Sequence, residues 1–140
     1  MAERAIMEII IHCTGNRPGC KMTMKDFRRL HQSKGWSDVG YHYIVFEDGR
    51  IEPGRPIFLP GSHCKRGGHN RYSIGIAYVG GLNEYGITAD TRTDAQKSAL
   101  IGLLKQLNAK YHVPIYGHRD FDRGKACPCF DAKTEYSWIR

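Results

Sequence analysis

The stretch EIIIH at residues 8–12 places three consecutive isoleucines directly before His12. A short, continuous run of β-branched residues is expected for a strand that is covered on both faces. Such a strand lies in the middle of its sheet. We therefore predict a layered fold built around this strand, with His12 emerging at the strand's end.

Four more segments have strand patterns, and they are residues 43–47, 50–52, 73–79 and 114–117. The turn signal Asp48-Gly49 joins the first two into a hairpin, which Pro53 is expected to interrupt. Glycine, proline and polar residues dominate residues 54–72, so we predict a long loop there. Loops of this length in compact domains are usually functional.

Helix patterns cover residues 24–34, residues 93–111 and a short turn over residues 131–138. The first helix begins after the capping residue Thr23, and the second begins with a capping box formed by Thr93 and Gln96. The order strand, helix, hairpin, strand, helix, strand predicts an α/β fold with a mixed central β-sheet flanked by α-helices.

Length and charge limit the classes of function. The 140 residues fit a single domain over residues 1–140, with the first five and the last few residues expected to be flexible. A formal net charge of +7 favours anionic partners, but the basic residues are scattered and no nucleic-acid-binding motif accompanies them. We therefore do not expect nucleic acid to be the primary ligand.

The N-terminal residues have no long apolar region, and no segment is long and apolar enough to span a membrane. These features predict synthesis in the cytoplasm without a signal peptide. The five cysteines are an odd number, which favours reduced thiols over a disulfide framework, although Cys13 and Cys20 can in principle pair.

His12 and His118 each follow a short apolar segment, and Cys127 stands between Ala126 and Pro128. Two imidazoles and a thiolate suit zinc, and three protein ligands leave a position for water, as a catalytic zinc requires. The alternative is packing, because a lone histidine or cysteine at a strand end is usually a core residue. Spacing alone does not decide between the two, since only a fold can bring these residues together.

Seven motifs, in the same order along the chain, resemble those of the zinc-dependent N-acetylmuramoyl-L-alanine amidases. The resemblance is greatest to amidase-type bacteriophage lysozymes and peptidoglycan recognition proteins, and it runs from about residue 9 to residue 131. The motifs are residues 11–14 (IHCT), 36–43 (WSDVGYHY), 48–55 (DGRIEPGR), 61–63 (GSH), 69–70 (HN) with 73–76 (SIGI), 117–120 (GHRD) and 125–128 (KACP).

The resemblance implies hydrolysis of the amide bond between N-acetylmuramic acid and L-alanine in peptidoglycan, with one zinc ion per chain. His12, His118 and Cys127 fall on the zinc-ligand positions. Tyr41 and Lys125 fall on the positions of the catalytic tyrosine and lysine. Without the resemblance, we would interpret Tyr41 as a buried aromatic residue and Lys125 as a solvent-exposed charge.

Three polar residues are candidates for contact with the substrate, namely His63, His69 and Asn70. The two histidines also fit structural or cleft-wall roles. Cys129 lies two residues from Cys127 and is a competing sulfur, although the alignment of the KACP motif selects Cys127. Cys13 should point to the sheet face opposite His12 and is therefore not expected to bind the metal.

Two further alternatives concern partners and delivery. A non-catalytic peptidoglycan-binding module can have the same fold, but loss of a ligand usually marks such a module, and all three ligands are present here. An RNA polymerase partner, as in some phage amidases, has no support in the sequence. We expect a phage or prophage endolysin that reaches the wall after release, with a secreted effector or a recycling amidase as alternatives.

Overall fold

The computed structural model describes residues 4–139 and places the isoleucine strand inside a five-stranded sheet. This strand, β1 (Glu8–Cys13), pairs in parallel with β4 (Ser73–Tyr78) on one side and with β5 (Ile115–Gly117) on the other. β2 (Tyr43–Val45) adds in parallel to β4, and β3 (Ile51–Pro53) pairs antiparallel to β2 at the edge. The predicted mixed sheet is confirmed.

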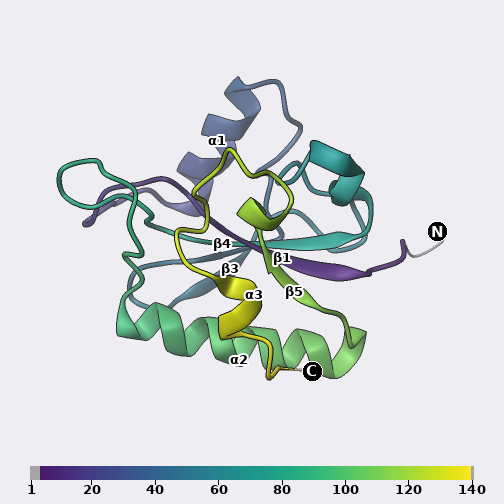
Figure 1. Cartoon of the computed structure of the whole chain (residues 1–140). Helices are drawn as coiled ribbons and strands as arrows, with labels where there is room; N and C mark the ends of the chain where they lie inside the picture. Colours follow the sequence, from purple (N-terminus) through teal and green to yellow (C-terminus); the bar gives the residue numbers. More distant parts are fainter. Residues whose placement is uncertain (1–3, 140) are drawn as a thin grey trace.

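Helices cover both faces of the sheet, with α1 (Met24–Ser33) on one side and α2 (Asp94–Tyr111) along the other (Figure 1). The short α3 (Ala132–Glu135) packs beside β5. Because side chains alternate along a strand, Ile9, Ile11 and Cys13 share the face that packs against α2. His12 therefore projects from the opposite face of the sheet. The predicted α/β architecture is confirmed.

The capping box predicted at the start of α2 is present. The Thr93 hydroxyl accepts the Gln96 N–H, and the Gln96 side-chain oxygen accepts the Thr93 N–H at 2.9 Å. The amide nitrogen of Gln96 also donates to the carbonyl oxygens of Val45 and Val79, at 3.1 and 3.0 Å. The buried Gln96 side chain thus caps the N-terminus of α2 and connects it by hydrogen bonds to the ends of two strands.

The hairpin differs from its prediction at Pro53, which pairs with Tyr43 as the last residue of β3 instead of interrupting the strand. A proline is tolerated there because β3 is an edge strand. The long loop after the hairpin contains a 3₁₀ segment, η1 (Arg66–Arg71). Arg4, near the start of the described chain, donates to the carbonyl oxygens of Ile57 and Ser73. Of the terminal residues expected to be flexible, residues 1–3 and 140 lie outside the described residues.

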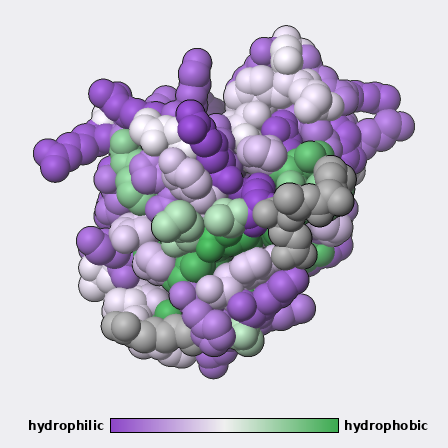
Figure 2. Space-filling view, turned by 90° about the vertical axis from the view of Figure 1, so that its right-hand side faces the viewer, coloured by the Kyte–Doolittle hydropathy of each residue, from purple (hydrophilic) through white to green (hydrophobic). Residues whose placement is uncertain are grey.

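A cavity of about 410 Å³ lies between β5 and α3. Val113, Pro114, Ile115, Tyr136 and Ile139 supply much of its apolar lining. Apolar residues line a hollow on the side of the molecule shown in Figure 2. The predicted metal ligands lie elsewhere. Within residues 4–139, no helix combines the length and apolar character needed to cross a membrane.

Replacing Leu104 with alanine should lower the free energy of unfolding by about 3 kcal/mol, because the substitution leaves a cavity between α2 and the sheet. The side chain of Leu104 is fully buried. Leu30 in α1 is 44% exposed, so Leu30→Ala should cost less than about 1 kcal/mol. Urea titration of both variants measures the difference. Equal losses of stability in the two variants would contradict the placement of Leu104 in the core.

Candidate metal centre and active site

Three segments that are distant in sequence bring the predicted ligands together at one edge of the sheet. Ile11 pairs with Gly117 across the parallel strands β1 and β5, so the residues that follow, His12 and His118, emerge side by side. Their ring centroids are 4.7 Å apart. Cys127 arrives on the loop after the 3₁₀ turn η2 (His118–Asp120), and its sulfur lies 3.8 Å from His12 Nδ1.

One ligand atom from each of His12, His118 and Cys127 lies within 4.8 Å of the other two. Two imidazole nitrogens and one sulfur form a donor set that suits zinc, and a set of three leaves a coordination position for solvent or substrate. Burial lowers the pKa of both histidines, and for His118 the nearby Lys125 charge adds to this effect. Near neutral pH the imidazoles are therefore uncharged, the state in which they bind a metal.

Hydrogen bonds hold both the sulfur of Cys127 and the backbone around it. The Cys13 N–H donates to it at 3.2 Å, which would stabilise a thiolate. The Cys127 carbonyl oxygen accepts the Arg119 N–H at 2.8 Å, and the Tyr78 hydroxyl donates to the next carbonyl, that of Pro128, at 2.6 Å. These contacts connect the cysteine to the turn that carries His118 and to β4.

Cys129, the competing sulfur, faces away from His12. Its backbone φ of 72° turns the chain, and its sulfur lies 3.9 Å from the Cys13 sulfur and 3.5 Å from the Gly81 carbonyl oxygen. Burial, with the nearby Cys13, raises the pKa of Cys129 to about 12. The geometry therefore favours Cys127 as the third ligand.

Tyr41 lies beside the metal centre, just before β2. Its ring centroid is 5.3 Å from that of His12, and burial raises the pKa of the phenol well above its ordinary value. The hydroxyl is thus a neutral hydrogen-bond donor near neutral pH. His31 supports this segment, because its Nδ1 accepts the Gly40 N–H at 2.8 Å and its ring packs 5.5 Å from Tyr41.

The supporting role of His31 was not predicted from the sequence. The available signal was its place on the buried face of α1, where Met24 and Phe27 are its neighbours. That pattern is equally typical of an ordinary core residue.

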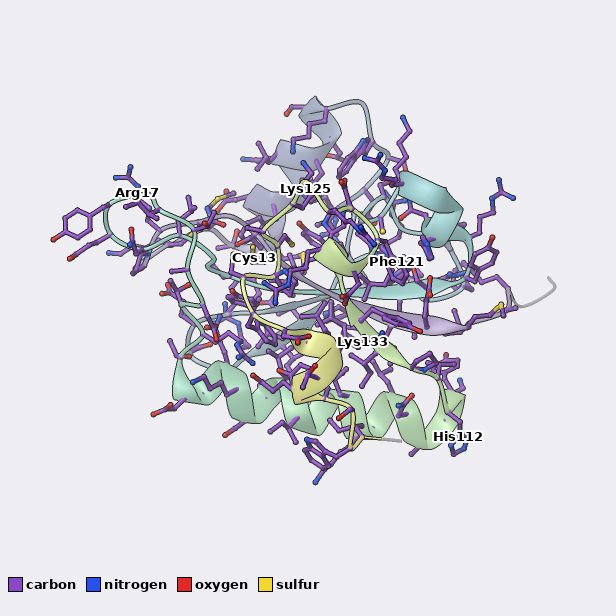
Figure 3. All side chains as sticks on the ribbon, viewed as in Figure 1. Cys13, Arg17, His112, Phe121, Lys125 and Lys133 are labelled. Atoms are coloured by element: carbon purple, nitrogen blue, oxygen red, sulfur yellow. The ribbon has the colours of Figure 1, made fainter. Side chains whose placement is uncertain are left out.

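Lys125, labelled in Figure 3, lies on the loop between His118 and Cys127, and the end of this loop contacts Cys13 at the end of β1. Its side chain is exposed, and its backbone N–H donates to the Asp122 carbonyl oxygen at 2.9 Å. Burial lowers the pKa of His118, the Asp122 charge raises it and the positive charge of Lys125 lowers it, so Lys125 lies close to this ligand. This is a suitable position for stabilising negative charge that develops on a bound substrate.

The three candidate substrate contacts lie behind or beside the ligands. Both ring nitrogens of His63 contact buried protein groups, Nδ1 with His12 at 2.8 Å and Nε2 with Ser73 at 3.1 Å. The Asn70 side-chain oxygen accepts the His63 N–H at 3.0 Å, and it also accepts the N–H of the next residue. This arrangement argues against direct substrate contact by His63 and gives the Asn70 oxygen a structural role.

His69 packs beside η2, the turn that carries the ligand His118. Its Nδ1 contacts the carboxylate of Glu8, and its ring stacks on Phe121 with the centroids 3.8 Å apart. Phe121 follows η2 directly, and its N–H donates to the His118 carbonyl oxygen at 3.0 Å. Phe121, labelled in Figure 3, belongs to the same loop as Lys125. His69 therefore connects η1 to the turn that presents His118.

Comparison with known proteins gives one family and consistent structural neighbours. A family model described as N-acetylmuramoyl-L-alanine amidase matches residues 2–130. The endolysin of Escherichia phage T7 is 39% identical over 125 residues, which cover 89% of this chain and 82% of that protein.

Solved structures agree with the sequence relatives. The N-acetylmuramoyl-L-alanine amidase LysC from Clostridium intestinale superposes with a TM-score of 0.80 at 32% identity, covering 94% of this chain and 82% of that one. Drosophila PGRP-LB superposes with a TM-score of 0.75 at 26% identity, covering 96% of this chain and 81% of that one.

Proposed function

This chain belongs to the N-acetylmuramoyl-L-alanine amidase family, and on that premise we propose that it cleaves peptidoglycan with a zinc ion bound by His12, His118 and Cys127. The bond is the amide between N-acetylmuramic acid and the L-alanine of the stem peptide. The observation that carries the proposal is the convergence of two imidazoles and one sulfur from three separate segments. The chain is an enzyme of cell-wall lysis, as its endolysin relatives are.

The residues around the proposed metal site have separate roles in amide hydrolysis. When bound, zinc supplies a Lewis acid for the carbonyl and lowers the pKa of water. His12, His118 and Cys127 would hold the ion, and a set of three protein ligands would keep a coordination position for water or substrate. The Lys125 ammonium stabilises negative charge on the carbonyl oxygen, a contribution that is typically worth about 3 kcal/mol. Tyr41 holds a proton on its hydroxyl beside His12, where it can orient the attacking water or donate a hydrogen bond.

A non-catalytic peptidoglycan-binding module is the second candidate function, because recognition proteins share the fold. The complete ligand set, with Tyr41 and Lys125 beside it, favours catalysis over binding alone. For the cellular setting, we propose that the protein acts on the wall after release, as an endolysin does. Neither residues 4–139 nor the comparisons support an RNA polymerase partner.

Digestion of defined muropeptides by the zinc-loaded protein should release intact stem peptides with a free L-alanine amino group. Mass spectrometry of the products identifies the cleaved bond. Activity should disappear when a chelator removes the metal and return when zinc is added back. New reducing sugar ends would reassign the bond, and muropeptide binding without turnover would establish the binding module instead.

A further inference from the structure

We propose that His63 is a positioning residue that fixes the tautomer and ring orientation of the metal ligand His12 through a buried chain of hydrogen bonds ending at Ser73. The proposal rests on the metal centre proposed above. It assigns to His63 a role in metal affinity instead of a substrate contact. The three side chains come from β1, the long loop and β4, and each is buried.

The protons along this chain can be assigned from the geometry. His12 Nδ1 faces the Cys127 sulfur at 3.8 Å, so Nδ1 is the ligand atom and carries no proton. A neutral His12 then has its proton on Nε2, which lies 2.8 Å from His63 Nδ1. His12 therefore donates and His63 Nδ1 accepts. Because Nδ1 is an acceptor, the His63 proton is on Nε2, from which it donates to the Ser73 hydroxyl oxygen at 3.1 Å.

The pocket is shaped around the His63 ring. A β-carbon at Gly75 would lie 2.5 Å from His63 Cγ, and a β-carbon at Gly61 would lie 2.5 Å from His63 Cδ2. Real side-chain atoms do not approach so closely, so both positions require glycine while the ring stays in place. The Asn70 oxygen holds the backbone of His63 as described above. The ring therefore has one orientation, the one that presents Nδ1 to His12.

Two arginines fix the loop that carries His63, because Arg55 donates to the Pro60 carbonyl oxygen and Arg4 to the Ile57 carbonyl oxygen. Arg55 is buried and donates to the carbonyl oxygens of Val39, Pro60 and Asp38. Arg4 donates to Ser73 O at 2.9 Å, close to the end of the chain. A neutral ring is required, because a protonated Nδ1 would oppose the His12 N–H.

A hydrogen-bond acceptor for the second ring nitrogen of a ligand histidine strengthens metal binding. Ligand histidines usually donate their second N–H to a carboxylate, a carbonyl or water, and loss of that partner typically costs about 10- to 100-fold in affinity or activity. A neutral histidine can serve as the acceptor only in one tautomer. The Ser73 hydroxyl is compatible with that tautomer, because its oxygen can accept the His63 Nε2–H.

Two amide substitutions of His63 separate a positioning role from simple packing. His63→Asn can place its side-chain oxygen near the position of Nδ1 and keep an acceptor for His12. His63→Gln places its amide near the position of Nε2, so it can reach Ser73 but lacks an acceptor at Nδ1. Zinc affinity is measured by competition with a chromophoric chelator, and thermal unfolding of the zinc-free proteins reports on the fold.

We expect His63→Asn to keep zinc affinity within about 3-fold of wild type and His63→Gln to lose about 10- to 100-fold. Equal zinc affinity in the two variants, whether lowered or unchanged, would overturn the proposal and leave His63 as a packing residue. If His63→Gln does not fold, Ser73→Ala provides the test. It leaves the His63 Nε2–H without its acceptor and should weaken zinc binding several-fold, and unchanged affinity would contradict the chain.

The outcome is distinguishable from failure of the proposed function. Muropeptide digestion by the wild-type protein decides the reaction and does not depend on His63. A split in zinc affinity between the two amide variants, with no turnover by wild type, would support the positioning role and reject the amidase. Turnover by wild type with equal zinc affinity in the two amide variants would support the amidase and reject the positioning role.

Discussion

Replacing Cys127 with serine is expected to lower zinc affinity by more than about 100-fold and to reduce peptidoglycan hydrolysis to background. This loss exceeds the usual effect of removing a residue that only hydrogen-bonds to a ligand. A serine hydroxyl stays protonated near neutral pH and does not replace a thiolate as a zinc ligand. The Cys13 N–H that now faces the sulfur would also lose a charged acceptor. Zinc content after dialysis and turnover of a soluble muropeptide measure both effects.

Cys129→Ser is the matched control, because it makes the same chemical change two residues away. The Cys129 sulfur faces Cys13 and the Gly81 carbonyl oxygen, so this variant should keep its zinc and most of its activity. If Cys129→Ser lost the metal while Cys127→Ser retained it, the third ligand would have to be reassigned.

Lys125→Ala is expected to lower kcat by on the order of 100- to 1,000-fold while zinc content stays at the wild-type level. The ammonium group stabilises charge that develops only as the carbonyl is attacked, so its loss affects the chemical step more than substrate binding. The side chain is exposed, and truncating it should leave the fold intact. Steady-state kinetics with a soluble muropeptide, together with zinc analysis, give the two quantities.

Lys133→Ala removes the same charge from α3, where the ammonium lies 5.6 Å from the Tyr116 ring, and should have little effect on kcat. Lys125→Arg keeps a positive charge and should recover part of the rate. A Lys125→Ala protein with unchanged kcat would remove Lys125 from the catalytic residues. Loss of zinc in that variant would instead assign it to metal binding.

Much of the fold could be predicted because its signals are local. The run of isoleucines at residues 9–11 identified a strand covered on both faces, and these side chains are indeed fully buried. Thr93 and Gln96 form the capping box that their spacing predicted. Pro53 was misjudged, because its effect depends on whether its strand lies at an edge of the sheet, which is a property of the tertiary structure.

The predicted ligands were found by their chemistry and by the family resemblance, and the structure brings all three together. The support of these ligands was harder to predict. His12 and His63 are 51 residues apart, and their contact depends on the space left by Gly61 and Gly75. In the sequence, His63 is one of seven histidines with no periodic pattern to separate a ligand support from a substrate contact.

A zinc-edge anomalous diffraction map of crystals of the zinc-loaded protein tests the metal centre most directly. We predict one peak among His12 Nδ1, His118 and the Cys127 sulfur, about 2.0 Å from each nitrogen and about 2.3 Å from the sulfur. A peak bound by Cys13 and Cys129, or no peak within reach of the two histidines, would contradict the proposed site and the hydrolytic chemistry assigned to it.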